Sequence, residues 1–343
     1  MHLRSRVQLK WLCRRERQLQ DALRVAVSVL ESEGVAFGQG TDCAFDDAAW
    51  LLLWSLGLPR DRLDDFRESR LSCVESRRFA RSLCRRVQAR MPVAYITCEA
   101  WLQGLCFRAD PRALIPRSLL VEALAWCADE GLLGKPSEIL DLCTGSGSIL
   151  VHAALRYPQA RLYGSDLSGE ALALAAENLN AHGLEGRWEL RTGSGLDPWG
   201  DTRVDLLLCN PPYVRDDAME LLPPEFLAEP RLALRGGPDG MHFLRQWLPT
   251  AARYLHREAS VLIEIGRGAE DFEQAFPGLE PIWVPVAAGS RMVMLLQESL
   301  LCSYFHAGDA RTGASDDASR ALDDPGRGAL DDAGWGAAAY RAR

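Results

Sequence analysis

An α/β fold is predicted for most of this chain: a seven-stranded, mostly parallel sheet, preceded by a small all-helical domain. Up to about residue 90, apolar residues recur at helical spacing. From Ser137 onward, short apolar runs alternate with helical patterns, which is typical of a parallel sheet covered on both faces. The last two runs are joined by a short link, residues 287–290, that cannot hold a crossover helix, so one strand runs antiparallel.

The helical domain is predicted to span residues 1–91. Two apolar stripes indicate amphipathic helices: Leu19, Leu23 and Val27, and then Phe79, Leu83 and Val87. Between them, residues 48–58 form a continuous apolar run. We expect this run to be a buried helix that ends near Gly57 and Pro59, because glycine and proline are common just beyond a helix.

Residues 92–117 are predicted to link the two domains. Pro92 ends the last helix of the first domain, since proline has no amide hydrogen and disfavours helix in the residue before it. The stretch 94–110 alternates in polarity, is rich in β-branched and aromatic residues, and has Gln103-Gly104 near its middle. This pattern indicates a β-hairpin.

The α/β domain is predicted to span residues 118–300, beginning with an amphipathic helix over 118–130 that Ser118 caps. The predicted strands are residues 138–143, 161–166, 187–192, 204–209, 260–265, 281–286 and 291–296. The predicted helices between them are residues 149–157, 168–182 and 241–256. Past about Phe305 large apolar residues are scarce, so the last segment, 301–343, is predicted to be a disordered tail.

The composition indicates a globular cytoplasmic protein without a metal site. Apolar residues make up 48% of the chain and charged residues 25%, which is ordinary for a soluble domain. Apolar stretches are too short to span a bilayer, and the first residues carry charges where a signal peptide needs an apolar core. The ten cysteines include no C-x-x-C pair, so we expect small core residues in a reducing compartment.

The net charge of −8 is unevenly distributed along the chain. Residues 1–90 contain 17 basic and 12 acidic side chains, whereas residues 91–300 contain 17 basic and 28 acidic ones. An acidic second part disfavours a surface that follows the phosphate backbone of nucleic acid. It suits a basic protein partner instead.

The first motif with chemical meaning is the turn DLCTGSG, residues 141–147. A predicted strand enters it, and a helix follows at once, so Gly145 and Gly147 let free backbone N–H groups approach a ligand. A dinucleotide-binding turn needs a third glycine where this chain has Leu150, which disfavours NAD. The acid before the turn, Asp141, fits a ligand with an ammonium group, such as the amino-acid end of S-adenosylmethionine.

A second acid, Asp166, ends the next predicted strand. A carboxylate at this place can accept hydrogen bonds from both hydroxyls of a ribose, and Ser168 then caps the following helix. An acid before a helix is also favourable for purely electrostatic reasons. Its position one strand after the glycine turn favours the ribose interpretation.

The third motif, Asn210-Pro211-Pro212-Tyr213, follows the predicted strand 204–209. The prolines stop the strand, so Asn210 lies at the carboxyl edge of the sheet, where open α/β folds bind ligands, although a plain turn is also consistent with Asn-Pro. A planar nitrogen is a weak nucleophile because its lone pair is delocalised. The Asn210 side-chain oxygen and the Pro211 carbonyl could accept its N–H hydrogens and orient the lone pair toward a methyl donor. Tyr213 could pack against a flat group.

These motifs resemble those of methyltransferases that use S-adenosylmethionine to methylate planar nitrogens, and among them the protein glutamine-N5 methyltransferases of the HemK/PrmB group. The resemblance spans roughly residues 11–296 and implies a Rossmann-like class I sheet, with the helical domain holding a protein substrate. The cofactor-binding residues that it implies are Asp141, Cys143, Thr144, Gly145, Gly147, Asp166, Leu167 and Asn210. The catalytic residues that it implies are Asn210, Pro211, Pro212 and Tyr213.

Two segments are similar to the PrmB branch of this group, which methylates a glutamine of large-subunit ribosomal protein L-three. Pro116-Arg117-Ser118 and Glu122 have the spacing of this branch and differ from the release-factor branch. After the core motif, the similar residues are Leu222-Pro223, Glu225, Glu229-Pro230 and Gly237-x-Asp239-Gly240. The implied partner is a basic ribosomal protein, with nucleic acid contacted only indirectly if RNA presents that substrate.

Two positions depart from the pattern of the group. Ser194-Gly195 stands where an acid usually holds the adenine, so a neighbouring backbone group or Asp197 is the candidate for that contact. The last link, residues 288–291, reads AGSR where GGDG is expected. Two other functions stay open: a DNA adenine-N6 methyltransferase, because an exocyclic amine poses the same chemical problem, and a non-catalytic factor that binds S-adenosylmethionine during ribosome assembly.

Overall fold

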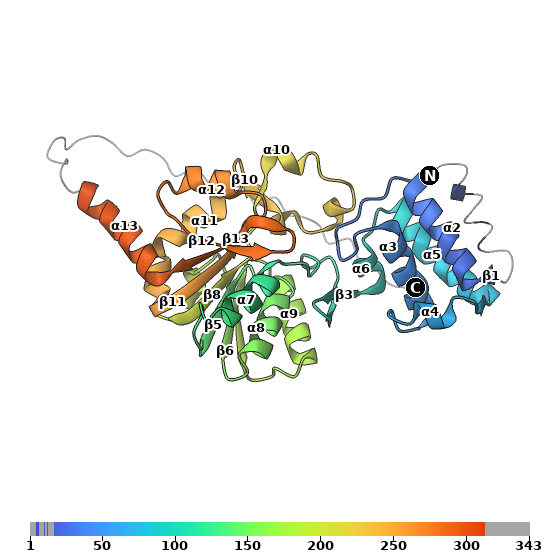
Figure 1. The fold of residues 1–343 in the computed structure, drawn as a ribbon, viewed down its shortest axis with the longest axis horizontal. Coiled ribbons are helices and arrows are strands. Elements are labelled where there is room, and N and C mark those ends of the chain that lie inside the picture. Colours follow the sequence, from blue (N-terminus) through green and yellow to red (C-terminus); the bar gives the residue numbers. More distant parts are fainter. Residues whose placement is uncertain (1–4, 7–9, 11, 13–16, 313–343) are drawn as a thin grey trace, which may run out of the picture.

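A computed structural model describes residues 5–6, 10, 12 and 17–312 of the chain. Figure 1 shows an elongated molecule of two lobes, with a helical lobe at one end and an α/β lobe that carries the large sheet. A linker with a β-hairpin joins them. The helical N-terminal region and the mostly parallel sheet confirm the predicted fold class.

The core of the helical lobe lies between three helices whose inward faces carry the predicted apolar stripes. Within residues 17–91, the helices of this lobe are α2 (Leu19–Ser32), α3 (Ala44–Leu56), α4 (Leu63–Phe66) and α5 (Cys73–Gln88), and β1 (Arg17–Gln18) pairs with β2 (Arg70–Leu71). At the start of α5, the Ser72 hydroxyl and the Glu75 carboxylate cap each other's backbone N–H groups. The buried helix α3 ends at Gly57, which has the left-handed conformation that glycine allows.

The linker differs from the predicted hairpin in its first part. Its five residues after Pro92 form a short helix, α6 (Val93–Thr97), whose side chains are all buried. This helix contacts α3 and α5, so burial against the helical lobe outweighs the strand-like alternation of the sequence. The hairpin follows as β3 (Glu99–Leu102) and β4 (Leu105–Arg108), and it turns at the predicted Gln-Gly pair, where both residues have positive φ.

The α/β lobe is built on a sheet with the strand order β12-β13-β11-β8-β5-β6-β7. The strands are β5 (Glu138–Leu142), β6 (Arg161–Asp166), β7 (Trp188–Thr192), β8 (Val204–Cys209), β11 (Leu255–Glu264), β12 (Ile282–Val286) and β13 (Gly289–Gln297). As predicted from the short link before it, β13 runs antiparallel to its neighbours. The order of the parallel strands reverses between β5 and β8, and ligands bind outside the carboxyl ends of strands at such a point.

Helices cover both faces of this sheet. One face packs against α7 (Leu120–Asp129), α8 (Ser148–Arg156) and α9 (Gly169–Ala181), and the other against α11 (His242–Trp247), α12 (Ala269–Ala275) and α13 (Glu298–Thr312). Alternate residues of β8 belong to the two cores: Leu206 and Leu208 to the first, Leu207 and Cys209 to the second. This strand is therefore buried on both faces, as its continuous apolar sequence predicts.

Two predictions for the C-terminal half are wrong in part. The helix predicted over 241–256 is split, because Pro249 cannot donate a helical hydrogen bond and the chain continues as a 3-10 helix, η4 (Leu248–Tyr254). The predicted disordered tail starts too early, since α13 extends to Thr312. The Tyr304 hydroxyl ties this helix to the rest of the lobe by donating to the Pro277 carbonyl at 3.1 Å. The remainder of the predicted tail, residues 313–343, lies outside the described residues.

The prediction that the cysteines are small core residues holds for only some of them. Among the described cysteines, Cys127 and Cys209 are buried, but four are exposed: Cys43, Cys73, Cys98 and Cys106. The described residues contain no group of three or more His, Cys, Asp or Glu side chains that could hold a metal ion. Nor do they form any helix that is long and apolar enough to cross a membrane.

Candidate active site

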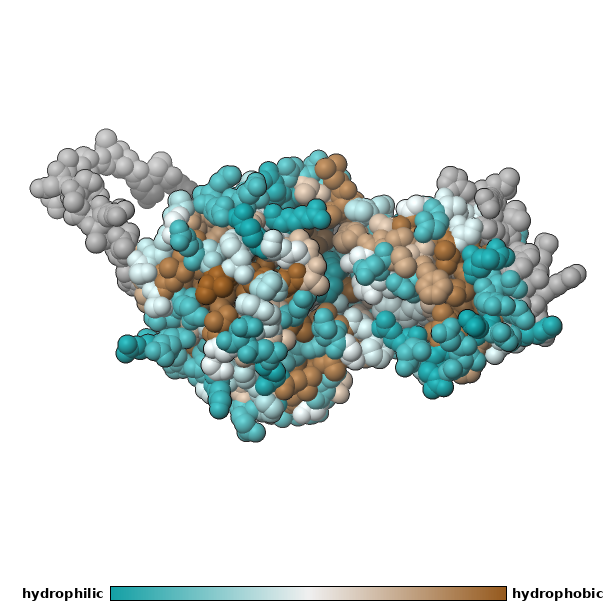
Figure 2. Space-filling view, viewed as in Figure 1, coloured by the Kyte–Doolittle hydropathy of each residue, from teal (hydrophilic) through white to brown (hydrophobic). Residues whose placement is uncertain are grey.

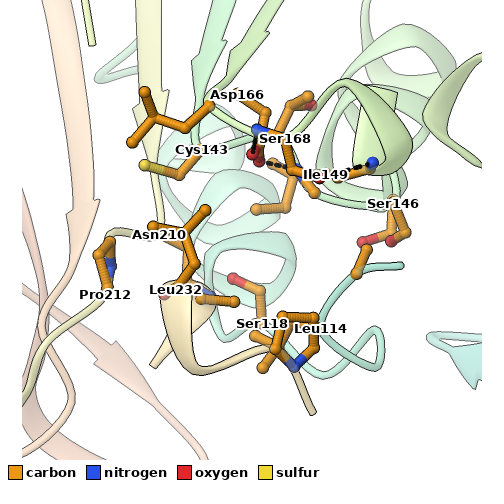
Figure 3. Close-up of a pocket in the computed structure, with 18 of the residues that line it drawn as sticks. Leu114, Ser118, Cys143, Ser146, Ile149, Asp166, Ser168, Asn210, Pro212 and Leu232 are labelled. Atoms are coloured by element: carbon orange, nitrogen blue, oxygen red, sulfur yellow. Dashed lines mark hydrogen bonds between the residues drawn. The ribbon is translucent and has the colours of Figure 1, made fainter. Parts of the chain in front are cut away.

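Two adjoining cavities lie at the carboxyl edge of the sheet, where the strand order reverses. Figure 3 shows the first cavity, to which the linker, the turn after β5, the end of β6 and the turn after β8 contribute residues. The second cavity shares Leu114, Arg117, Asn210 and Ala233 with the first. In the space-filling view the surface is hollowed where the two lobes meet (Figure 2). The fold therefore brings the three sequence motifs to one place.

The turn after β5 forms the floor of the first cavity. Cys143, Thr144 and Gly145 line it, and both Cys143 and Gly145 have positive φ. Gly147 is the N-cap of α8 and faces α9, because a Cβ atom there would lie 3.1 Å from the Cβ of Ala175. Position 147 therefore needs a glycine so that α8 can pack against α9, whereas Gly145 lies at the cavity. Of the two glycines, Gly145 lines the cavity, and a ligand contact of Gly147 stays a prediction.

Asp141 lies behind this turn and does not line the cavity. Its side chain is fully buried, and burial raises its pKa to about 8. The Thr144 hydroxyl donates to its Oδ2 at 2.7 Å, while its Oδ1 has no hydrogen-bond partner among the described residues. A buried acceptor without a donor is costly, so this atom suits a ligand group or a water that donates a hydrogen bond. The predicted ammonium contact of Asp141 stays a prediction.

Asp166, the last residue of β6, lines the cavity and is held from two sides. Its Oδ2 accepts the Gly145 N–H at 3.0 Å, and its Oδ1 accepts the Ser168 N–H at 2.9 Å. Burial raises its pKa, and the backbone donors oppose that shift. The carboxylate is thus fixed between the glycine turn and the start of α9, where Ser168 is the predicted cap. Leu167 lines the same cavity and is 52% exposed.

The side of the first cavity near Gly195 lacks an acid. The Ser165 hydroxyl donates to the Gly195 carbonyl at 2.9 Å, and the Phe243 ring lies 3.6 Å from where a Cβ of Gly195 would be. Both Gly195 and Phe243 line the cavity, whereas Asp197 is exposed and does not. Of the two candidates for the adenine contact, the backbone around Gly195 is therefore the one at the cavity.

Asn210 lies where the two cavities meet. It follows β8 directly, lines both cavities, and makes no hydrogen bond through its side chain with any described residue. Pro212 lines the first cavity, and Pro211 and Tyr213 line the second. The predicted catalytic tetrapeptide thus forms the wall between two separate spaces.

The second cavity is covered by a segment for which the sequence analysis predicts no secondary structure. We call residues 216–234 the strap. It contains α10 (Asp216–Met219), η2 (Phe226–Ala228) and η3 (Arg231–Ala233), and it lies between β9 (Val214–Arg215) and β10 (Arg235–Gly237), which pair in parallel. Leu222, Phe226, Ala233 and Leu234 contribute to the second cavity. The strap contains most of the second of the two segments that resemble the PrmB branch, with Leu222-Pro223, Glu225 and Glu229-Pro230.

Glu229 of the strap is buried and binds the linker. The Arg117 guanidinium donates to both of its oxygens, Nη1 to Oε1 at 2.5 Å and Nη2 to Oε2 at 2.9 Å. The Ile115 N–H also donates to Oε1 at 3.0 Å, and the Gln39 amide of the helical lobe donates to Oε2 at 2.8 Å. Because Arg117 lines both cavities, this ion pair fixes a residue of the site itself.

A second buried acid, Glu225, binds the strap to the helical lobe. Its Oε1 accepts the Ala36 N–H at 3.2 Å and the Arg90 guanidinium at 3.1 Å, and the Arg86 Nη1 is 3.6 Å away. Arg86 is itself buried and paired with Asp47 inside the helical lobe. The strap therefore connects both lobes through its two buried glutamates.

The motif analysis did not assign four residues of the site: Glu264, Phe243 and Arg117 line the cavities, and Glu229 fixes Arg117. Glu264 could have been found by the reasoning used for Asp166, because it is an acid at the carboxyl end of a strand. Arg117 and Glu229 belong to segments that carried the family resemblance, but no local pattern predicts that they pair across 112 residues. Phe243 gives no signal of its own, since an aromatic residue in a helix is more often part of the core.

Comparison with known proteins supports the interpretation of the motifs. Residues 118–240 match the family model described as "Methyltransferase small domain". The chain is 42% identical over 289 residues to the ribosomal protein uL3 glutamine methyltransferase of Bordetella pertussis, covering 82% of this chain and 96% of that protein. It is 39% identical to the protein of the same name from Burkholderia pseudomallei, covering 82% of this chain and 95% of the relative.

Solved structures of other methyltransferases also align. TrmN from Thermus thermophilus superposes with a TM-score of 0.39 and 21% identity, covering 72% of this chain and 77% of that one. The curated relatives are much more similar, at 42% and 39% identity over 82% of this chain. The chain therefore belongs to the family of ribosomal protein uL3 glutamine methyltransferases.

Proposed function

We propose that this chain transfers a methyl group from S-adenosylmethionine to the side-chain amide nitrogen of a glutamine in ribosomal protein uL3. The observation that carries this proposal is the position of Asn210, which lines both cavities. A hydrogen-bond acceptor at that junction can hold an amide in the second cavity so that its nitrogen faces the first.

The residues around the first cavity fit S-adenosylmethionine, which supplies an electrophilic methyl group when it is bound. Asp166 presents a fixed carboxylate that suits the two ribose hydroxyls. The Oδ1 of Asp141, which no described residue engages, suits the ammonium group, directly or through water. Leu167 and Phe243 offer apolar surface for the adenine, and the backbone near Gly195 offers polar groups for its edge.

The second cavity holds the substrate amide. The Asn210 side-chain oxygen and the Pro211 carbonyl accept the two N–H hydrogens, which orients the nitrogen lone pair toward the methyl group. Pro212 limits the backbone at Pro211, because the residue before a proline has few allowed conformations. Tyr213 packs against the flat amide. The N–C bond forms as the S–C bond of the sulfonium breaks, which leaves S-adenosylhomocysteine. The methylated nitrogen is acidic, so one of its protons passes to water without a dedicated base.

A protein substrate is also supported by the surface around the cavities. Three strap leucines are well exposed: Leu221 by 83%, Leu227 by 47% and Leu232 by 52%. Exposed apolar side chains next to a cavity are typical of protein-binding surfaces. The acidic charge of residues 91–300 suits a basic ribosomal protein, and RNA takes part only as a carrier of that protein. We place the reaction in the cytoplasm, where ribosomal proteins are made.

The DNA adenine alternative and the non-catalytic alternative are not favoured, since both relatives compared above are named glutamine methyltransferases. The test is direct. Purified protein is mixed with uL3 and isotope-labelled S-adenosylmethionine, and the products are analysed by peptide mass spectrometry. One labelled methyl group on a single glutamine is expected, and uL3 with that glutamine replaced by alanine serves as control. Label in duplex DNA, or none in uL3, would contradict the proposal.

Replacing Asp166 with alanine should weaken donor binding. The variant loses a carboxylate that two backbone N–H groups hold at the cavity. Hydrogen bonds to a charged group contribute about 1.5–3 kcal/mol each, so the Kd for S-adenosylmethionine should rise roughly 10- to 100-fold. Isothermal titration calorimetry measures this directly. The exposed Asp129→Ala is the matched control and should bind like the wild type; an unchanged Kd for Asp166→Ala would remove Asp166 from the donor site.

A further inference from the structure

A buried carboxylate forms part of the second cavity and has no role in the reaction described so far. Glu264 is the last residue of β11, is 4% exposed, and lines the cavity together with Asn210 and Tyr213. No described residue forms an ion pair with it, and burial raises its pKa. A buried acid without a counter-ion is costly, so the fold must satisfy it with hydrogen bonds.

The hydrogen bonds to Glu264 come from two different walls of the site. The Tyr213 hydroxyl donates to its Oε1 at 3.2 Å. The Ser118 hydroxyl and the Leu119 N–H donate to its Oε2 at 2.6 Å and 2.9 Å. Ser118 also accepts the Leu120 N–H at 3.2 Å, so the predicted cap of α7 acts one residue before the N-cap that the structure shows. One carboxylate thus binds the catalytic tetrapeptide and the beginning of α7.

Tyr213 is held at both of its ends. A Cβ atom at Gly266 would lie 2.8 Å from the Tyr213 Cε2, so the ring rests directly on the backbone just after β11. Its hydroxyl is fixed by Glu264 two residues earlier in the chain. On the other side of Glu264, Ser118 lines the first cavity, where it is labelled in Figure 3. Glu264 therefore connects the wall of the substrate cavity with the wall of the donor cavity.

We propose that Glu264 is a positioning residue, which acts through Tyr213 and Ser118 to set the substrate amide at the correct place relative to the methyl donor. The proposal rests on the assignment of the second cavity to the glutamine. Transfer of a methyl group requires the reacting atoms to be close and aligned, and a displacement of about 1 Å can lower the rate roughly 100-fold. A satisfied buried network is rigid enough to hold that alignment.

The test uses Tyr213→Phe, which removes only the hydroxyl, and Glu264→Gln, which keeps the size of the side chain but offers one acceptor oxygen. Each single variant should lower kcat for uL3 methylation about 10- to 100-fold, with the Kd for the donor and the KM for uL3 within roughly threefold of wild type. The double variant should be no slower than the slower single variant, because both changes break the same bond.

Tyr163→Phe is the matched control. Its hydroxyl donates to Glu138 at 3.0 Å in a similar pair, at the opposite edge of the sheet from both cavities, and its loss should leave kcat unchanged. Multiplicative losses in the double variant, or single variants with wild-type kcat, would overturn the positioning role. If Glu264→Gln does not fold, the kcat of Tyr213→Phe alone still tests the positioning role of Glu264. Wild-type protein that fails to methylate uL3 in the same assay would instead reject the proposed function.

Discussion

Asn210→Ala should lower kcat for glutamine methylation by about 10²- to 10³-fold, the loss that follows removal of one preorganised polar group at a reacting centre. Asn210 lines both cavities, and no described residue engages its side chain, so its amide is available to the substrate. In the proposed binding mode the methyl donor is held mainly by the turn after β5 and by Asp166, which line the first cavity, so its Kd should change by less than about threefold. Single-turnover methylation of uL3 and calorimetry with S-adenosylmethionine measure these two quantities.

Two further variants sharpen this result. Asn210→Asp keeps an oxygen that can accept an amide N–H, so it should retain more activity than Asn210→Ala. Asn180→Ala removes an exposed asparagine at the end of α9, which accepts a hydrogen bond from Trp188 far from both cavities, and it should leave kcat unchanged. An alanine variant at position 210 that methylates uL3 at the wild-type rate would show that the acceptor role is wrong.

Most of the fold could be predicted because its elements have strong local patterns. The seven strands were predicted from short apolar runs, and β8 is buried on both faces as its sequence requires. The errors in predicted secondary structure occur where burial decides between helix and strand, or where a single proline interrupts a helix. Residues 93–97 alternate like a strand but form α6, because the helical lobe buries all five side chains. Pro249 splits the helix predicted over 241–256, although its apolar pattern continues on both sides.

The candidate site was predictable only where its residues follow a strand directly. Asp166 and Asn210 were found because the carboxyl ends of parallel strands meet at one edge. The ligand contact predicted for Gly147 is untested, whereas the need for glycine there to pack against α9 is a contact that the sequence cannot reveal. The pairing of Arg117 with Glu229 depends on how the strap crosses the linker, and such long-range contacts leave no local signal. The strap is therefore a finding of the structure.

Arg117→Ala should be the most destabilising substitution near the site. It leaves the buried Glu229 carboxylate with its two weaker donors, Ile115 N–H and the Gln39 amide, and without a cation. Removal of one partner from a buried ion pair costs about 3–5 kcal/mol, because the remaining charge is neither solvated nor paired. The midpoint of thermal unfolding should fall by roughly 10 °C. Scanning calorimetry checks this, and far-UV circular dichroism establishes that the variant is folded beforehand.

The destabilisation by Arg117→Ala comes from the unpaired charge of Glu229, so a second substitution that removes this charge should compensate. Arg117→Met combined with Glu229→Gln removes both charges at similar volume, and this pair should be clearly more stable than Arg117→Ala alone. Arg117→Lys keeps the charge but cannot donate to both carboxylate oxygens in parallel, so it should lie between wild type and Arg117→Ala. Arg156→Ala breaks an exposed pair with Asp129 and should change stability by less than about 1 kcal/mol. Equal losses for Arg156→Ala and Arg117→Ala would mean that the strap does not depend on the ion pair with the buried Glu229.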